Sequence, residues 1–347
     1  MDHVRFALVG CSPFGLNYVN SVMDHPDAVM VAVCDLDSER ARVASERSYG
    51  IPYFTDYYEM LKMGGFDCVI VATPDHTHCE YSVAALRAGC HVLCEKPLAP
   101  SLEECREIVR ASEESGRLLM TGQVARKSPS FIKAKELIES GEIGEVFFIE
   151  SEYAHNYGYM QGWRRDPAIP RHGILGGGCH ALDIVRWLVG NPTEVIALSS
   201  RRALPDWPTD STTVCIFKLP RGAVGKVFCS IGAIRKYTMR TCIYGTKGTV
   251  ICDNISTEVT LYRHAVSPTG EHSYPKVDIP VGGGSKKISD EVAEMIDAIL
   301  LAREVECDAI EGANTVALAL AAIESAAKGG VAVKPRYLKR NRKNRLL

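Results

Sequence analysis

The stretch LVGCSPFG, Leu8–Gly15, has the spacing of a turn that binds the pyrophosphate of a dinucleotide. Its first glycine, Gly10, permits a tight turn, and its last, Gly15, lets a helix pack closely on a strand. Ser12 replaces the middle glycine, and its hydroxyl can donate to a phosphate oxygen. Asp35 lies 20 residues beyond Gly15, where a carboxylate accepts hydrogen bonds from the adenosine ribose and repels a 2′-phosphate. The pattern predicts that NAD, rather than NADP, binds at this turn.

A nucleotide-binding turn needs a buried parallel sheet around it, and the first third of the chain has the sequence pattern of such a sheet. Helical stretches alternate with short apolar runs at Val4–Val9, Val29–Cys34, Cys68–Ala72, His91–Cys94 and Leu118–Thr121. Strands that alternate with helices predict βαβ units with right-handed crossovers, and therefore an α/β, doubly wound Rossmann sheet. The alternative is a flavodoxin-like sheet that binds nothing at the glycine turn.

Helix ends are also marked in this part of the chain. Asp37 has the position of an N-cap. Ser101 and Glu104 have capping-box spacing, and Gly116 has the position of the glycine that ends the same helix.

After about residue 121 the pattern changes. One helix, SFIKAKELIESG, is followed by alternating runs such as EVFFIESEYAH and TTVCIFKLP, with Gly, Pro, Asn and Asp between them. This alternation predicts a mostly antiparallel sheet with one packed face. Two helical stretches, near 290–304 and 314–328, follow it. We expect a dinucleotide-binding Rossmann domain over 1–121 and an α+β domain over 122–347, with closing helices and a basic tail.

Composition excludes several classes of protein. The chain has 347 residues, 46% of them hydrophobic, and a formal net charge of -2, so neither nucleic acid nor a membrane is expected as a partner. The basic end, KPRYLKRNRKNRLL, is typical of a solvated terminus. The 13 cysteines include no C-x-x-C pair, which argues against a zinc ribbon or a disulfide framework. The N-terminus passes directly into a strand without signal-peptide features, so we expect a cytoplasmic protein.

Oxidation of a secondary alcohol needs a group that takes the proton while the cofactor takes the hydride. Lys96 ends an apolar run, and Pro97 holds its backbone extended. A lysine there can hydrogen-bond an alcohol oxygen and stabilise negative charge on it. His180 precedes the run ALDIVRWLVG, and an imidazole with a pKa near 6.5 suits a general base at neutral pH. By position alone, Lys96 also fits a surface residue at a strand end, and His180 a structural residue at a helix start.

Two longer stretches, VIVATPDHTHCEYSVAALRAGCHVLCEKPLA and GGGCHALDIVRWLVG, resemble the Gfo/Idh/MocA family of NAD(P)-dependent sugar and polyol oxidoreductases. The resemblance extends to the closing AIESAAKGGVAVKP and so covers nearly the whole chain. It implies a dehydrogenase that acts on CH–OH groups of a carbohydrate or polyol. It also implies that the second domain binds the substrate and carries a large open sheet, which commonly joins subunits into a homodimer or homotetramer.

The resemblance implies roles for particular residues. Lys96 of the Glu-Lys-Pro motif would lie beside the nicotinamide and the reacting carbinol, and His180 matches the active-site histidine, so these two are the predicted catalytic residues. The predicted cofactor-binding residues are Gly10, Ser12, Pro13, Phe14, Gly15, Asp35, Thr73, Pro74, His76, His78, Glu95, Lys96, Arg126, Trp163 and Arg164. The predicted substrate-binding residues are Lys96, Tyr153, Trp163, Arg164, His180 and Asp183. Asp183 also fits a role in orienting His180 or capping its helix.

Two positions depart from the family pattern. Asp75 stands where the family often has asparagine, and no cofactor contact is assigned to it. Gly176 stands where many members have an aspartate, four residues before the histidine, so the usual Lys–Asp–His trio is reduced to Lys96 and His180. We expect the glycines of GGGC to bring free backbone N–H groups close to the ligand. They would also leave room for a bulkier substrate, such as a glycoside with its aglycone.

The remaining histidines, His76, His78, His155 and His172, lack the spacing of a ligand set, so no metal is predicted. The segment YAHNYGYMQGWRRD suits sugar recognition or an ordered loop at a subunit contact. Two alternatives to a dehydrogenase stay open. One is redox-cycling glycoside hydrolysis or elimination with tightly bound NAD. The other is a non-catalytic regulatory protein that senses sugar or NAD.

Overall fold

The structure is a computed structural model that describes residues 3–282 and 287–340, and the end of the basic tail, 341–347, lies outside the described residues. The chain forms two compact units, each described by itself below. Unit 1 comprises Met1–Gln123, Lys287–Val316 and Tyr337–Leu347, and unit 2 comprises Val124–Lys286 and Ala317–Arg336. The predicted division of function at residue 121 stays a prediction.

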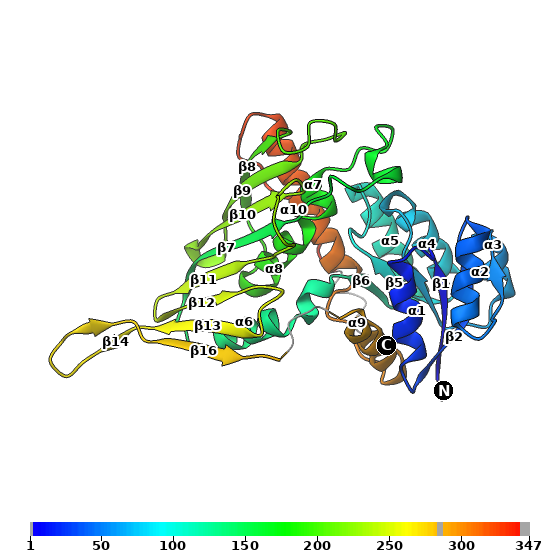
Figure 1. Ribbon diagram of the computed structural model, residues 1–347, viewed down its shortest axis with the longest axis horizontal. Helices are drawn as coiled ribbons and strands as arrows, with labels where there is room; N and C mark the ends of the chain where they lie inside the picture. The colour runs from blue at the N-terminus through cyan, green and yellow to red at the C-terminus, as the bar shows by residue number, and fades with distance from the viewer. Residues whose placement is uncertain (1–2, 283–286, 341–347) are drawn as a thin grey trace. The chain divides into compact units, whose positions relative to one another are not determined.

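Unit 1 is built on a six-stranded parallel sheet in the order β3-β2-β1-β4-β5-β6 (Figure 1). The order reverses beside β1, which is the point where doubly wound sheets bind their ligands. The predicted Rossmann fold is confirmed. The strands are β1 (Val4–Val9), β2 (Ala28–Cys34), β3 (Tyr53–Phe54), β4 (Cys68–Val71), β5 (His91–Glu95) and β6 (Leu119–Gly122).

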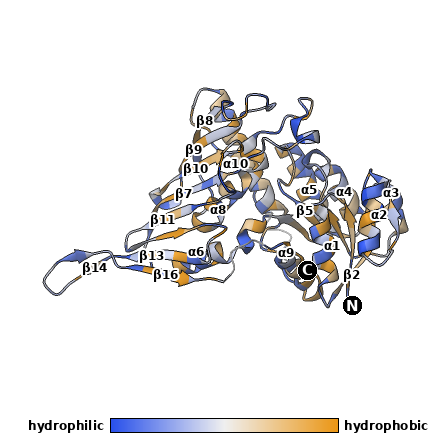
Figure 2. Cartoon of the chain, in the orientation of Figure 1, coloured by the Kyte–Doolittle hydropathy of each residue, from blue (hydrophilic) through white to orange (hydrophobic). Residues whose placement is uncertain are grey.

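Unit 1 contains helices that connect its strands and, in addition, two helical segments from the end of the chain. They are α1 (Gly15–Met23), α2 (Ser38–Arg47), α3 (Tyr57–Met63), the 3-10 turn η1 (Asp75–Thr77), α4 (His78–Arg87), α5 (Leu102–Ser115), α9 (Ile288–Leu300) and the start of α10 (Ala309–Ala327). Figure 2 shows apolar residues along the strands and polar residues on α2 and α3. Every residue of β4 is buried, as expected of a strand covered on both faces.

Local signals fix most helix ends in unit 1. The Asp37 side chain caps α2 by accepting from Glu39 N and Arg40 N. Ser101 and Glu104 form the predicted capping box of α5, and Gly116 ends that helix in the left-handed region, at φ 64°. The short elements β3 and α3 were not predicted, because a two-residue strand has no periodicity to detect.

Unit 2 is built on an eight-stranded sheet in the order β16-β13-β12-β11-β7-β10-β9-β8 (Figure 1). All its pairs are antiparallel except β7 with β10, so the predicted mostly antiparallel sheet is confirmed. The strands are β7 (Val146–Ala154), β8 (Glu194–Ser200), β9 (Thr212–Lys218), β10 (Val224–Ser230), β11 (Thr241–Gly245), β12 (Gly248–Cys252), β13 (Glu258–Arg263) and β16 (Lys276–Pro280).

The helices of unit 2 cover one face of this sheet, and α8 packs on β7 and β10. Buried and exposed residues alternate strictly along β9, as predicted for a sheet with one packed face. The other elements are η2 (Val124–Lys127), α6 (Pro129–Glu139), η3 (Gly162–Arg165), α7 (Gly173–Gly176), α8 (Cys179–Val189), η4 (Pro220–Gly222), the strands β14 (Ala265–Val266) and β15 (His272–Ser273), and the end of α10.

Candidate active site

The turn after β1 requires glycine at two positions. Gly10 has φ +97°, and a Cβ there would stand 2.6 Å from the backbone carbonyl carbon of Ala72. A Cβ on Gly15 would stand 1.9 Å from the Gly10 carbonyl oxygen, so α1 begins in direct contact with the turn. The tight turn and the close packing that the sequence predicts are therefore both present.

The N-terminus of α1 lies at this turn, and its N-cap residue, Phe14, makes no capping hydrogen bond through its side chain. The Ser12 hydroxyl oxygen accepts from Gly15 N at 3.3 Å, which leaves the hydroxyl hydrogen able to donate to another group. Phe14 is 44% exposed, and Pro13 is exposed beside it. Because the N-terminus of a helix attracts anions, this turn fits the pyrophosphate of a dinucleotide.

Two backbone N–H groups fix the carboxylate of Asp35 at the end of β2. Cys11 N donates to Oδ2 at 2.7 Å, and Asp37 N donates to Oδ1 at 2.9 Å. The carboxylate therefore lies against the glycine turn, where the ribose of a dinucleotide on that turn would meet it. Each oxygen keeps a further lone pair for a ribose hydroxyl. The residues present thus fit NAD.

The end of β4 is tied to the Glu-Lys-Pro turn by His78. His78 Nε2 lies 3.0 Å from the Thr73 carbonyl oxygen, and Nδ1 lies 2.8 Å from the Pro97 carbonyl oxygen. The ring is 1% exposed, so both nitrogens serve the protein itself. Thr77 Oγ1 contacts Thr73 Oγ1 at 2.8 Å. His78 therefore holds together the two segments predicted to line the cofactor, with Pro74 and His76 half-exposed on the first.

Carbonyl oxygens only accept hydrogen bonds, so both ring nitrogens of His78 must donate, as only the imidazolium can. Burial lowers the pKa of His78. The Cys94 sulfur, the Asp75 carboxylate and the Pro97 carbonyl oxygen outweigh burial and raise that pKa to about 9. The geometry and the direction of the pKa shift both favour the charged form of His78.

The Glu95 carboxylate makes two hydrogen bonds that hold the Glu-Lys-Pro turn in place. Its Oε1 accepts from the Tyr18 hydroxyl at 2.6 Å, and its Oε2 accepts from Lys96 N at 3.1 Å. Burial and the Glu95 and Glu291 carboxylates raise the pKa of Tyr18 well above its usual range, so the hydroxyl stays a donor. The Lys96–Pro97 bond is cis, and Lys96 itself is half-buried. Sequence analysis missed Tyr18, which has the position of an ordinary apolar contact on α1.

In unit 2, His180 lies near the start of α8 and is 2% exposed. Its ring stacks on Tyr153 of β7, with centroids 6.2 Å apart and planes 26° from parallel. The Tyr153 hydroxyl lies 2.7 Å from that of Tyr157 and 3.2 Å from His155 Nδ1. The pairing of Tyr153 with His180 is consistent with their predicted roles on the substrate side.

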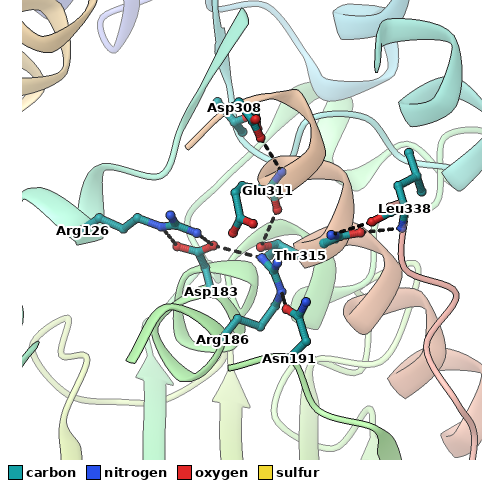
Figure 3. A network of polar contacts seen from close by, with 10 residues as sticks. Arg126, Asp183, Arg186, Asn191, Asp308, Glu311, Thr315 and Leu338 are labelled. Atoms are coloured by element: carbon teal, nitrogen blue, oxygen red, sulfur yellow. Dashed lines mark hydrogen bonds and ion pairs between the residues drawn. The ribbon is translucent and has the colours of Figure 1, made fainter. Parts of the chain in front are cut away.

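Arg126 and Asp183, predicted to serve the cofactor and the substrate, bind each other (Figure 3). The Arg126 guanidinium donates to both Asp183 oxygens at 2.7 and 2.8 Å, and Arg186 Nη1 lies 3.5 Å from Oδ1. Both partners are almost fully buried. The Asp183 carboxylate therefore anchors α8 to the segment after β6. Its predicted substrate contact and its alternative role at His180 stay predictions.

The triple glycine does not offer free N–H groups, contrary to expectation. Gly176 N donates to the His172 carbonyl, and the N–H groups of Gly177 and Gly178 both donate to the Gly173 carbonyl. A Cβ would meet the Arg171 guanidinium at Gly176, the Tyr153 ring at Gly177 and the Cys229 sulfur at Gly178. The space that glycine opens here is filled by protein side chains, because each glycine lets a neighbour pack on the helix start.

Two family profiles match the chain. Residues 4–123 match an oxidoreductase family with an NAD-binding Rossmann fold, and residues 131–251 match the GFO/IDH/MocA C-terminal domain. The cofactor is therefore NAD, as the glycine turn and Asp35 predict.

Similar proteins include two named dehydrogenases. Inositol 2-dehydrogenase 2 of Saccharopolyspora erythraea is 31% identical over 267 residues, which is 75% of this chain and 76% of the relative. Levoglucosan dehydrogenase of Pseudarthrobacter phenanthrenivorans is 26% identical over 86% of this chain and 88% of its own. The crystal structure of an oxidoreductase domain protein from Kribbella flavida has the same fold, with a TM-score of 0.87 at 21% identity over 96% of this chain and 100% of its own.

Two further findings concern the described residues alone. None of their helices is long and apolar enough to cross a membrane. They contain no group of three or more His, Cys, Asp or Glu side chains placed to hold a metal ion.

Proposed function

We propose that this chain, which belongs to the GFO/IDH/MocA family of NAD-binding oxidoreductases, transfers a hydride between NAD and a secondary hydroxyl of a sugar, inositol or glycoside. One observation carries the proposal. Asp35, Gly10, Thr73 and Lys96 follow β2, β1, β4 and β5, which are four adjacent strands of one parallel sheet. On the proposed assignment, the ribose, pyrophosphate and nicotinamide contacts follow one another along one sheet edge, in the order that an extended dinucleotide requires, and this strand order supports the proposal.

The chemistry divides between the cofactor and two side chains. Bound NAD accepts or supplies the hydride. Lys96 hydrogen-bonds the substrate oxygen and stabilises negative charge on it as its proton leaves. His180 is the proposed general base, and its stacking on Tyr153 fixes the plane of its ring.

The named relatives support the substrate class. One is an inositol 2-dehydrogenase and another a levoglucosan dehydrogenase, so both act on carbohydrate or polyol hydroxyls.

The test is to mix the purified protein and NAD with sugars, inositols and glycosides while following nicotinamide absorbance. Net NADH formation on at least one member supports the proposal. Product without net NADH would replace it with redox-cycling hydrolysis or elimination. NAD binding without turnover of any member would replace it with a sensing role.

The proposal includes a homodimer or homotetramer joined through the unit 2 sheet. The sheet face opposite α8 exposes large apolar side chains, among them Leu198 at 63% and Ile216 at 52%. Size-exclusion chromatography with light scattering measures the mass of the protein in solution, and the mass of a monomer would contradict the proposed oligomer. We also propose a cytoplasmic location, which is supported by thirteen buried cysteines that are all free thiols.

A further inference from the structure

Tyr18 links the helix that begins at the nucleotide turn to the Glu-Lys-Pro turn. It lies on α1, three residues after Gly15, and it is fully buried. Its hydroxyl donates to Glu95 Oε1 at 2.6 Å, whereas Glu291 Oε2 is farther away, at 3.4 Å. Burial raises the pKa of Tyr18, and both carboxylates add to the effect, so the hydroxyl keeps its proton. Glu95 is therefore the main acceptor of this hydrogen bond.

The Glu95 carboxylate passes this contact on to Lys96. The Glu95 side chain is buried, and its second oxygen, Oε2, accepts from the backbone N–H of Lys96 at 3.1 Å. Hydrogen bonds to a carboxylate are strong, and one bond on each oxygen fixes the rotation of the group. A chain of two hydrogen bonds therefore leads from the Tyr18 hydroxyl to the backbone of the residue that is predicted to contact the substrate.

The same helix also carries the turn that fits the pyrophosphate. α1 begins at Gly15, and Phe14 of the turn packs edge-on against the Tyr18 ring, with centroids 6.2 Å apart. Tyr18 thus contacts the nucleotide turn through its ring and the Glu-Lys-Pro turn through its hydroxyl. The position of Lys96 relative to the nucleotide turn is therefore set by one buried side chain.

We propose that Tyr18 is a positioning residue, which acts through Glu95 to hold Lys96 where hydride transfer requires it. This inference rests on the proposed function, in which Lys96 contacts the substrate oxygen. It adds a residue to which sequence analysis assigned no role. The effect of Tyr18 is on geometry, and geometry matters here because a misplacement of about 1 Å in a catalytic group slows a reaction by about 10²-fold.

Tyr18→Phe tests the proposal, because it removes one hydroxyl and keeps the buried ring. We expect kcat on a substrate that the wild type oxidises to fall by about tenfold or more, with little change in KM for NAD. Tyr57→Phe is the matched control. Tyr57 is another buried tyrosine of unit 1, and its hydroxyl donates to the Tyr81 carbonyl oxygen at 2.7 Å. This variant loses a comparable hydrogen bond that does not involve the Glu-Lys-Pro turn, so its kcat should match that of the wild type.

Glu95→Gln tests whether Tyr18 acts through Glu95. One terminal atom of glutamine is an NH₂ donor, so the amide cannot accept from both the Tyr18 hydroxyl and Lys96 N. We expect kcat of Glu95→Gln to fall at least as far as that of Tyr18→Phe. The double variant should be no slower than Glu95→Gln alone, because the two residues belong to one chain. Losses that multiply in the double variant would show that Tyr18 acts independently of Glu95, and would overturn the inference.

The reactivity of the Lys96 amine supplies a readout without turnover. Acetic anhydride acetylates the amine, and mass spectrometry compares its rate with that of Lys62, an exposed lysine on α3. Lys96 is half-buried, so a less restrained turn should expose it more often and label it faster in Tyr18→Phe, but not in Tyr57→Phe. The thermal midpoint shows whether each variant is folded. A wild-type kcat in Tyr18→Phe overturns the inference, as does an equal loss in Tyr57→Phe.

The two proposals fail in different ways. If the wild type oxidises a sugar and Tyr18→Phe does so at the same rate, the dehydrogenase stands and the role of Tyr18 falls. If no sugar is oxidised but Lys96 labels faster in Tyr18→Phe and not in Tyr57→Phe, Tyr18 positions Lys96 and the proposed function falls.

Discussion

Arg126 and Asp183 form a bidentate ion pair inside unit 2, with N–O distances of 2.7 and 2.8 Å, and both side chains are almost fully buried (Figure 3). The pair fixes α8 one turn beyond His180. Two residues that look like separate ligand contacts in the sequence therefore act as one support. Arg186 shares the same carboxylate, and its Nε donates to Asn191 Oδ1 at 2.8 Å.

Asp183→Asn should lower the free energy of unfolding by about 3–5 kcal/mol, because it removes the negative charge that Asp183 supplies to two buried arginines. Urea denaturation followed by circular dichroism measures this. Glu324→Gln is the control: it breaks the solvent-exposed pair with Lys328 and should leave stability almost unchanged. Equal stability of Asp183→Asn and wild type would contradict a structural role.

NAD should bind at least about tenfold more tightly than NADP, because the Asp35 carboxylate is fixed at the ribose position and repels a 2′-phosphate. Asp35→Ser should reduce the ratio of the NAD affinity to the NADP affinity, mainly because NADP binds more tightly to the variant. Fluorescence titration of both cofactors against both proteins measures it. If the wild type binds the two equally, the assignment of Asp35 is wrong.

Lys96→Ala and His180→Ala should each lower kcat by about 10²–10⁴-fold. NAD affinity should change little, since it derives mostly from pyrophosphate and adenosine contacts. Initial rates and NAD titration on each variant separate the two effects. A His180→Ala enzyme with a near-normal rate would show that this histidine is only a packing partner of Tyr153.

Stability should fall as pH rises through the range set by His78. Its folded pKa of about 9 lies above the ordinary value near 6.5, so the stabilisation is complete below pH 6.5 and lost as pH approaches 9. The loss amounts to about 3 kcal/mol at 1.36 kcal/mol per pKa unit. His78→Gln should remove this pH dependence.

Buried thiols also make stability depend on pH. Burial raises the pKa of Cys105, so this thiol ionises more readily in the unfolded chain and lowers stability in alkali. The comparison between wild type and His78→Gln separates the effect of His78 from that of the thiols. Urea unfolding at intervals from pH 6 to pH 9 supplies both curves. Parallel curves would contradict a buried imidazolium.

Gly176→Asp should lower activity on the best wild-type substrate, although it introduces the aspartate of the family's Lys–Asp–His trio. The new carboxylate would meet the Arg171 guanidinium and neutralise it. Gly176→Ala separates the steric effect from the charge, since its Cβ alone displaces the guanidinium. Rates on free inositols and glucosides test this, and a faster Gly176→Asp enzyme would refute it.

Short-range signals in the sequence are sufficient to predict the elements that depend on neighbouring residues. The apolar run Val4–Val9 forms β1 with the predicted bounds, Asp37 and Ser101 cap their helices, and Gly10 and Gly15 form the predicted tight turn. Such features follow from backbone conformation and periodicity, which a short stretch of chain carries within itself.

Which polar groups contact each other depends on how distant parts of the chain pack together. Arg126 is 57 residues from Asp183 along the chain, and Tyr18 is 77 residues from Glu95, so no local sequence pattern predicts either pair. The role of the triple glycine was settled in the same way, because the guanidinium beside Gly176 arrives from Arg171, which Trp207 and Thr209 hold in place from a distant loop. Buried charges and hydrogen-bond donors need partners, because leaving them unpaired away from water is unfavourable. Tertiary packing determines which groups are close enough to be those partners.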